Sequence, residues 1–203
     1  MIRQLFSGAL VVLALTVTSP AWAQGRAVGE RLIAQSGAPE RFTLEVTDQS
    51  IVIIDRSSGL RCSMPPNATE TTLTVSGDML QCGYTGGVYS NWMVVPTTAQ
   101  AGQVEMQRFV GAYALFQKEQ HTAQNLQPVT APPIHPALQQ IFPNAPTPFR
   151  VWMQDANPGA DFSVSLIAAD VNGHRVMQMI AGQSDTVNAL SDLSFFTSTA
   201  TPQ

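Results

Sequence analysis

Three histidines are the residues of this chain best suited to metal binding or acid–base chemistry, because imidazole ligates metals and changes charge near neutral pH. They are His121, His135 and His174, and each lies in a different predicted element. None has a second histidine three or four residues away, the spacing that lets one helix hold a metal ion. We therefore expect no metal ion and no other cofactor. Only His135, in a proline-rich segment, remains a candidate for acid–base chemistry.

Serine and carboxylate chemistry is the next possibility. The chain contains neither G-x-S-x-G nor S-x-x-K, the patterns that position a serine nucleophile. Asp155, Asp161, Asp170 and Asp185 stand beside predicted turns and helix starts, which is where aspartate is common for backbone reasons. Two carboxylates can still meet in space at the separation that glycosidases use, since such pairing is not visible in sequence spacing. A secreted hydrolase acting through carboxylates or His135 is therefore the alternative function.

Cys62 and Cys82 are the only cysteines in the 203 residues. They do not form a C-x-x-C redox motif, and two cysteines alone cannot complete a zinc site. In an exported protein, such a pair is expected to form one intramolecular disulfide. We expect the two predicted strands that carry them to be neighbours. Free or intermolecular thiols are the alternative.

Residues 1–23 have the pattern of a secretory signal. Arg3 supplies the positive charge, residues 9–17 are apolar apart from one threonine, and small residues precede Gln24. This pattern predicts cleavage before Gln24 and a periplasmic or secreted protein. The apolar run is too short to cross a bilayer, so we expect no membrane span in the mature chain.

The charge of the chain excludes one class of partner. Ten basic residues face fourteen acidic ones, for a net charge of −4, and the only lysine is Lys118. Proteins that bind nucleic acid need a clustered basic surface to neutralise phosphates. Because the basic residues here are scattered, we do not expect nucleic acid as a partner.

Hydrophobic alternation predicts a largely antiparallel sheet. Residues 41–46 and 50–54 form one expected hairpin, and Asn172-Gly173 is the strongest turn signal of a second. The second hairpin should pair Asp170 with Arg175 and Ala168 with Met177. It should also place seven side chains on one apolar face: Phe162, Val164, Leu166, Ala168, Met177, Met179 and Ala181.

The strand pattern also gives two tryptophans an outward position. If Gly86-Gly87 is a two-residue turn, Tyr84 faces Tyr89 and Trp92 lies on the face opposite Cys82. Residues 149–153 alternate as well, and there Trp152 lies opposite the apolar side chains. Trp92 and Trp152 are therefore candidates for a contact surface, and burial beneath a flanking helix is the other interpretation.

Three helical segments are expected. Residues 103–121 carry an amphipathic stripe, and a last helix begins at Ser184-Asp185, with Val187, Leu190, Leu193 and Phe196 as its buried side. Residues 127–148 contain seven prolines but also large apolar residues at helical spacing, with Pro136 suited to a first helical turn. We interpret this segment as an ordered strap over the core, where a binding site could lie.

The predicted architecture is one α+β domain over residues 41–197, with an antiparallel sheet, two packed amphipathic helices and the proline-rich strap. Residues 24–40 form an N-terminal arm, either a short helix or a mobile segment, and residues 198–203 form a frayed tail. An export signal without a catalytic motif favours a non-enzymatic binding or interaction module. Its partner would be an unknown protein or small ligand of the cell envelope.

Overall fold

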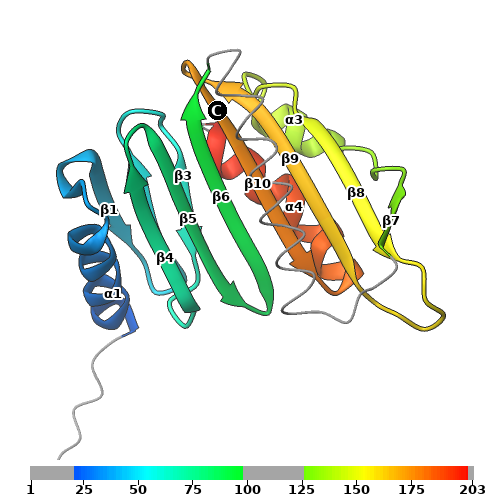
Figure 1. Ribbon diagram of the computed structural model, residues 1–203, viewed down its shortest axis with the longest axis horizontal. Helices are drawn as coiled ribbons and strands as arrows, with labels where there is room; N and C mark the ends of the chain where they lie inside the picture. The colour runs from blue at the N-terminus through cyan, green and yellow to red at the C-terminus, as the bar shows by residue number, and fades with distance from the viewer. Residues whose placement is uncertain (1–20, 98–125, 201–203) are drawn as a thin grey trace, which may run out of the picture.

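Two antiparallel β-sheets and the helices packed on them make up residues 21–97 and 126–200, the ranges that the computed structural model describes (Figure 1). The smaller sheet has the order β1-β2-β3, with bounds Phe42–Val46, Ile51–Asp55 and Arg61–Met64. The larger sheet has the order β4-β5-β6-β10-β9-β8-β7. Its strands are, in chain order, Thr69–Ser76, Met79–Gly86, Val88–Pro96, Leu126–Val129, Phe149–Asp155, Ser163–Val171 and His174–Gly182. The predicted α+β fold class is confirmed.

The helices occupy defined positions on these sheets. Helix α1 (Ala21–Gln35) packs against β1, β2 and β4, and a short 3-10 turn η1 (Pro39–Arg41) follows it. Helix α3 (Pro136–Ile141) and helix α4 (Ser184–Thr199) lie behind the larger sheet in Figure 1, where α4 packs on β9 and β10 and also reaches β3. Among the described residues, no helix is long and apolar enough to cross a membrane.

Helix α1 shows that the predicted N-terminal arm is mostly helical. Gly25 and Gly29 let it approach the smaller sheet closely. A Cβ atom at Gly29 would stand 2.5 Å from a methyl carbon of Leu44, and one at Gly25 would stand 3.2 Å from Val46. Together with the buried Leu32, these contacts all follow the predicted cleavage point before Gln24. A chain cleaved at the predicted point would therefore keep the part of α1 that packs.

The hairpin at Asn172-Gly173 forms as predicted. Gly173 has φ +75° and Asn172 has φ +49°, the left-handed values that a two-residue turn of this kind requires. Ala168 pairs with Met177, and Asp170 pairs with Arg175. The predicted apolar face is confirmed as well, since its members form one cluster: Phe162, Val164, Leu166, Ala168, Met177, Met179 and Ala181.

The β5–β6 hairpin differs from its prediction by one residue of register. Gly86 pairs with Val88 across Gly87, and of these two glycines it is Gly87 that has a positive φ, +75°. Cys82 therefore lies opposite Trp92, and the predicted pairing of Tyr84 with Tyr89 is wrong. Because side chains alternate between faces, a one-residue shift moves every side chain of a strand to the other face.

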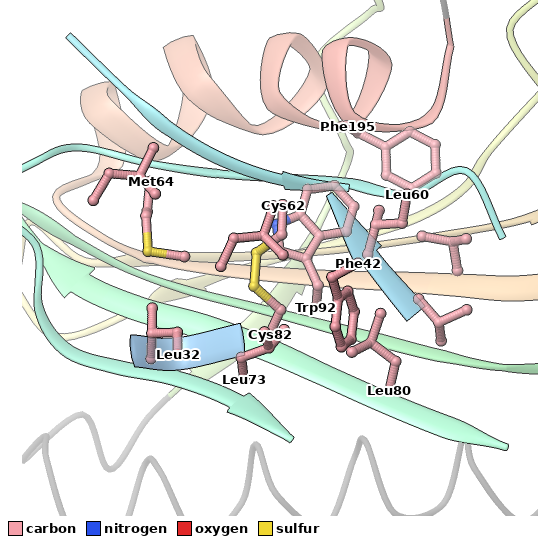
Figure 2. Packing of buried hydrophobic residues seen from close by; sticks show 14 of the residues in the cluster. Leu32, Phe42, Leu60, Cys62, Met64, Leu73, Leu80, Cys82, Trp92 and Phe195 are labelled. Atoms are coloured by element: carbon pink, nitrogen blue, oxygen red, sulfur yellow. A yellow bond between two sulfur atoms is a disulfide. The ribbon is translucent and has the colours of Figure 1, made fainter. Parts of the chain in front are cut away.

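The disulfide between Cys62 and Cys82 is confirmed, but it does not join neighbouring strands. Cys62 lies in β3 of the smaller sheet and Cys82 in β5 of the larger one, with their Cα atoms 6.6 Å apart. The bond therefore crosses the space between the two sheets. Trp92 lies beside it in the shared apolar core, and Phe195 of α4 closes that core (Figure 2).

Helix α4 buries two of the four residues predicted for its inner side, Val187 and Phe196, and exposes the other two. Its buried residues are Val187, Ser191, Phe195, Phe196 and Ser198. Leu190 and Leu193 are exposed, so their predicted burial is wrong. A repeat of exactly three residues turns back by about 60° at each step along an α-helix. Three such steps lead half-way around the helix, so the predicted stripe could not face one sheet.

The strap and the end of the last helix can also be compared with their predictions. The strap contains α3, which begins at Pro136 as predicted. Helix α4 continues to Thr199, and Ser198 is buried, so the helix extends into the predicted frayed tail. The predicted helix at 103–121, with His121, lies outside the described residues.

Candidate functional site

His135 and His174, the two histidines within the described residues, form hydrogen bonds with backbone groups. The Nδ1 atom of His135 accepts a hydrogen bond of 3.2 Å from the backbone N–H of Ala137 and caps α3. The ring of His174 lies 2.9 Å from the carbonyl oxygen of Asn172 at the hairpin turn. Within residues 21–97 and 126–200, no group of three or more His, Cys, Asp or Glu side chains is placed to hold a metal ion.

The four aspartates considered in the sequence have the local roles expected for turns and helix starts. Asp155 accepts a hydrogen bond from the N–H of Asn157. Asp161 accepts one of 3.0 Å from the N–H of Ser184 and so caps α4 from a distance, while Asp185 lies in the first turn of that helix. Asp170 forms an exposed ion pair with Arg175, and this hydrogen-bonded pairing lowers the pKa of the Asp170 carboxyl.

A buried carboxylate that sequence reasoning missed is Asp55, at the end of β2. It accepts hydrogen bonds from Arg41 Nε at 2.6 Å and from a terminal guanidinium nitrogen at 2.9 Å, and others from Ser57 and Ser58. Burial raises the pKa of the Asp55 carboxyl, but the hydrogen bonds from Arg41, Ser58 and Ser57 outweigh burial and lower it to about 2. With its oxygens engaged in this way, Asp55 ties the β2–β3 turn to η1 and is a structural group.

Asp192 is the carboxylate whose environment most resembles that of an active-site acid. Burial raises its pKa, and the nearby guanidinium of Arg150 only partly opposes this. The two side chains form an ion pair of 2.7 Å between α4 and β8. This pair lies within the contact of helix and sheet, and it lines neither of the surface hollows described below.

Trp92 and Trp152 are not surface residues. Their exposed fractions are 1% and 2%. Trp92 stacks on Phe195 of α4 with ring centroids 5.9 Å apart, and Trp152 packs with Val187 of the same helix. The prediction of a contact surface at these residues is therefore wrong, and burial beneath a flanking helix is what the structure shows. For Trp152 the strand face was predicted correctly, but α4 covers it.

The exposed apolar side chains lie elsewhere. Within the described ranges, all the exposed large hydrophobic residues follow Leu126 in the chain: Val129, Ile141, Phe149, Leu190 and Leu193. Leu193 is one turn before Phe196, whose ring contacts Phe142 with centroids 6.1 Å apart. Ile141 directly precedes Phe142. We call Ile141, Leu190 and Leu193 the α3–α4 surface, and their exposed fractions are 46%, 36% and 44%.

A hollow of about 240 Å³ includes Phe142, which directly follows Ile141, and Phe196, one turn after Leu193. It is lined mainly by apolar side chains of the strap together with Phe196: Ile134, Gln139, Phe142, Pro143, Ala145, Pro146, Thr147, Pro148 and Phe196. We call it the strap hollow. A second, more polar hollow of about 430 Å³ shares Pro146 with it and reaches Asp170 and Asn172. Pro146 of the strap therefore lies in the wall of both hollows.

The strap is also free of charge. Residues 126–149 contain no Asp, Glu, Lys or Arg. The core of a protein interface is depleted in charged residues and enriched in aromatic residues, compared with the rest of the surface. This charge-free stretch is the signal by which the sequence could have indicated the site, since the exposed leucines follow only from how α4 is rotated.

Comparison with known proteins finds no match for this chain. No family model, no curated protein and no solved structure matches it.

Proposed function

We propose that the protein is an exported, non-enzymatic binding module that holds a partner protein at the α3–α4 surface and the strap hollow. The observation that carries this proposal is the orientation of α4. Its positions toward the sheet include Ser191 and Ser198, whereas Leu190 and Leu193 point to solvent. An amphipathic surface helix normally places its leucines on the buried side and its serines on the exposed side. Exposed apolar groups that cluster are typical of a surface that another molecule covers.

Export rests on two features of the chain. The first 23 residues have the pattern of a secretory signal. The buried Cys62–Cys82 disulfide is compatible with an oxidising compartment, because such bonds persist outside the cytoplasm. We infer a periplasmic or secreted location, with the mature chain beginning at Gln24.

The size and lining of the strap hollow favour a protein partner over a cofactor. Sites for small molecules usually enclose about 300–1,000 Å³, and the strap hollow has about 240 Å³. This volume suits one or two apolar side chains of a partner. Leu190 and Leu193 would then contact the apolar residues that surround those side chains.

Site-specific photo-crosslinking tests the proposal in cells that export the full chain. A photoreactive amino acid at position 193 should give an adduct of discrete mass, whereas the same amino acid at Asn188, also exposed on α4, should not. The adduct at 193 should disappear in a Leu190→Asp background and persist in an Asn188→Asp background, which adds the same charge. Equal adducts from both positions, or no response to Leu190→Asp, would contradict the proposal.

A further inference from the structure

The contact between α4 and the larger sheet contains an unusual group of buried polar atoms. Five of them have no hydrogen-bond partner among the described residues: Arg150 Nε, Trp152 Nε1, Ser165 Oγ, Gln178 Oε1 and Asp192 Oδ1. Trp152, Ser165 and Gln178 are each at most 2% exposed. A buried polar group without a partner destabilises a fold, so such atoms are rare and need an explanation.

Four of these residues lie in two adjacent rows on one face of the larger sheet, and the fifth, Asp192, lies on α4. Trp152 and Ser165 are direct cross-strand partners on β8 and β9. Ile167 pairs with Arg150 on one side and with Gln178 on the other, which places both in the next row of the same face. The guanidinium carbon of Arg150 lies 6.0 Å from the centre of the Trp152 ring.

Helix α4 covers these rows with polar contacts of its own. Asp192 Oδ2 accepts a hydrogen bond of 2.7 Å from Arg150, and the side-chain N–H of Gln178 donates one of 2.8 Å to Ser194. Arg150, Asp192 and Gln178 thus each have one polar atom with a hydrogen-bond partner and one without. We call the five residues with unpartnered atoms the polar layer.

The chemistry of the polar layer specifies what can satisfy it. Arg150 Nε and Trp152 Nε1 are donors, Gln178 Oε1 and Asp192 Oδ1 are acceptors, and the Ser165 hydroxyl is both. The two acceptor oxygens would repel an anion, and the two N–H groups would repel a cation. A neutral molecule that donates and accepts is required, and water is the smallest that does so. Internal waters typically make about three hydrogen bonds to polar groups of this kind.

We propose that the polar layer is a built hydration site, in which internal water molecules bridge β8, β9 and β10 to α4. The waters connect the donors of Arg150 and Trp152 to the acceptors of Gln178 and Asp192, and Ser165 lies between them. The helix is then held on this half of the sheet partly through water rather than by direct packing. This inference is independent of the partner bound at the α3–α4 surface.

Two measurements on the full-length mature protein test the hydration site. In rotating-frame NMR, the indole N–H of Trp152, assigned by comparison with Trp152→Phe, should show a cross-peak to water whose sign indicates close contact rather than hydrogen exchange. In urea unfolding, Ser165→Ala should lower the midpoint by roughly 0.3–0.5 M, because a bridging water loses a partner. Without water, the same substitution removes an unsatisfied hydroxyl and leaves the midpoint unchanged or raises it.

Ser163→Ala is the matched control, since Ser163 is on the same strand and equally buried, and its hydroxyl donates directly to Ser184 at 2.8 Å. Its midpoint should fall with or without internal water, which verifies that the assay detects one lost hydrogen bond. The cross-peak together with a lowered midpoint for Ser165→Ala supports the proposal. Absence of the cross-peak, or a midpoint at or above that of the wild type, overturns it.

Discussion

The two halves of the larger sheet are covered by different elements, one by the smaller sheet and the other by a helix. Over β4, β5 and β6 lies the smaller sheet, joined by the Cys62–Cys82 disulfide and closed by α1 at glycine contacts. Over β8, β9 and β10 lies α4, which contacts the strands partly through serines and the polar layer. We call these the stapled half and the strap half. Since β6 pairs with β10, they share one sheet, and the difference lies in what covers it.

The strap also differs from the stapled half in charge, although the strap half has a buried ion pair of its own, Arg150–Asp192. In the stapled half, the buried Asp55 is satisfied by Arg41, and the exposed Glu45 pairs with Arg61. In the strap half, residues 126–149 carry no charge, and Leu193 is exposed. A charged surface is costly to desolvate, whereas an uncharged apolar one is not. Under the proposed function, the stapled half supplies stability and the strap half supplies the surface for binding.

The largest effect should come from breaking the buried ion pair of the stapled half. Arg41→Ala leaves the Asp55 carboxylate buried without its cation, and we expect a loss of about 3 kcal/mol in the free energy of unfolding. Arg61→Ala breaks a pair whose side chains are both exposed, and it should cost less than about 1 kcal/mol. Urea unfolding at pH 7 compares the two. Equal losses would show that Asp55 is not the anchor of this half.

The same pair predicts how stability depends on pH. The pKa of Asp55 is about 2 in the fold against an ordinary 3.8. A lowered pKa stabilises the fold above about pH 4, and this stabilisation, roughly 2 kcal/mol, is lost as the pH falls toward 2. Unfolding curves between pH 5 and 2.5 should therefore converge for the wild type and Arg41→Ala. A constant gap between them would contradict the assignment.

The disulfide should give an effect of similar size. Cys62 and Cys82 are 20 residues apart, and closing a loop of this length stabilises a fold by about 3 kcal/mol in the chain-entropy model. For a chain of this size, the double substitution Cys62→Ala and Cys82→Ala should lower the melting temperature by about 6–12 °C. Thiol titration of the denatured, unreduced wild type should find no free thiol. Two reactive thiols per chain would refute the bond.

A smaller effect is expected at the hairpin that joins β9 to β10. A Cβ atom at Gly173 would meet nothing within 4 Å, so Gly173→Val should cost only backbone strain, about 1–2 kcal/mol. Gly173→Asn should cost less, because asparagine tolerates positive φ values better than valine does. Thermal unfolding of the two variants measures the difference. No difference would mean that the turn does not hold Gly173 at positive φ.

The smallest effect on stability should be at the proposed binding surface. Leu193 is 44% exposed, so Leu193→Asp should change the free energy of unfolding by no more than about 0.5 kcal/mol. Ser191→Asp places the same side chain on the buried side of α4, and there a charge without a partner should unfold the helix from the sheet. Circular dichroism during thermal unfolding distinguishes them. A large loss from Leu193→Asp would show that this residue belongs to the core.

The elements determined by the sequence alone are those in which a local backbone preference decides the outcome. Asn172-Gly173 adopts positive φ at both positions, so the register of β9 with β10 followed from two residues. Pro136 starts α3 because its ring already has a helical φ and needs no donor partner. The disulfide followed from counting cysteines in a chain with an export pattern.

Only the tertiary structure decided which face of β6 and which side of α4 are covered. Gly86-Gly87 allows either of two registers, and the one observed turned Trp92 toward the disulfide. The rotation of α4 buried Ser191 and exposed Leu193, although leucine is the more apolar residue. Local patterns describe one segment at a time, whereas burial depends on segments that are distant in the chain. That is why the Asn172-Gly173 turn was predictable, and why the polar layer and the exposed leucines were not.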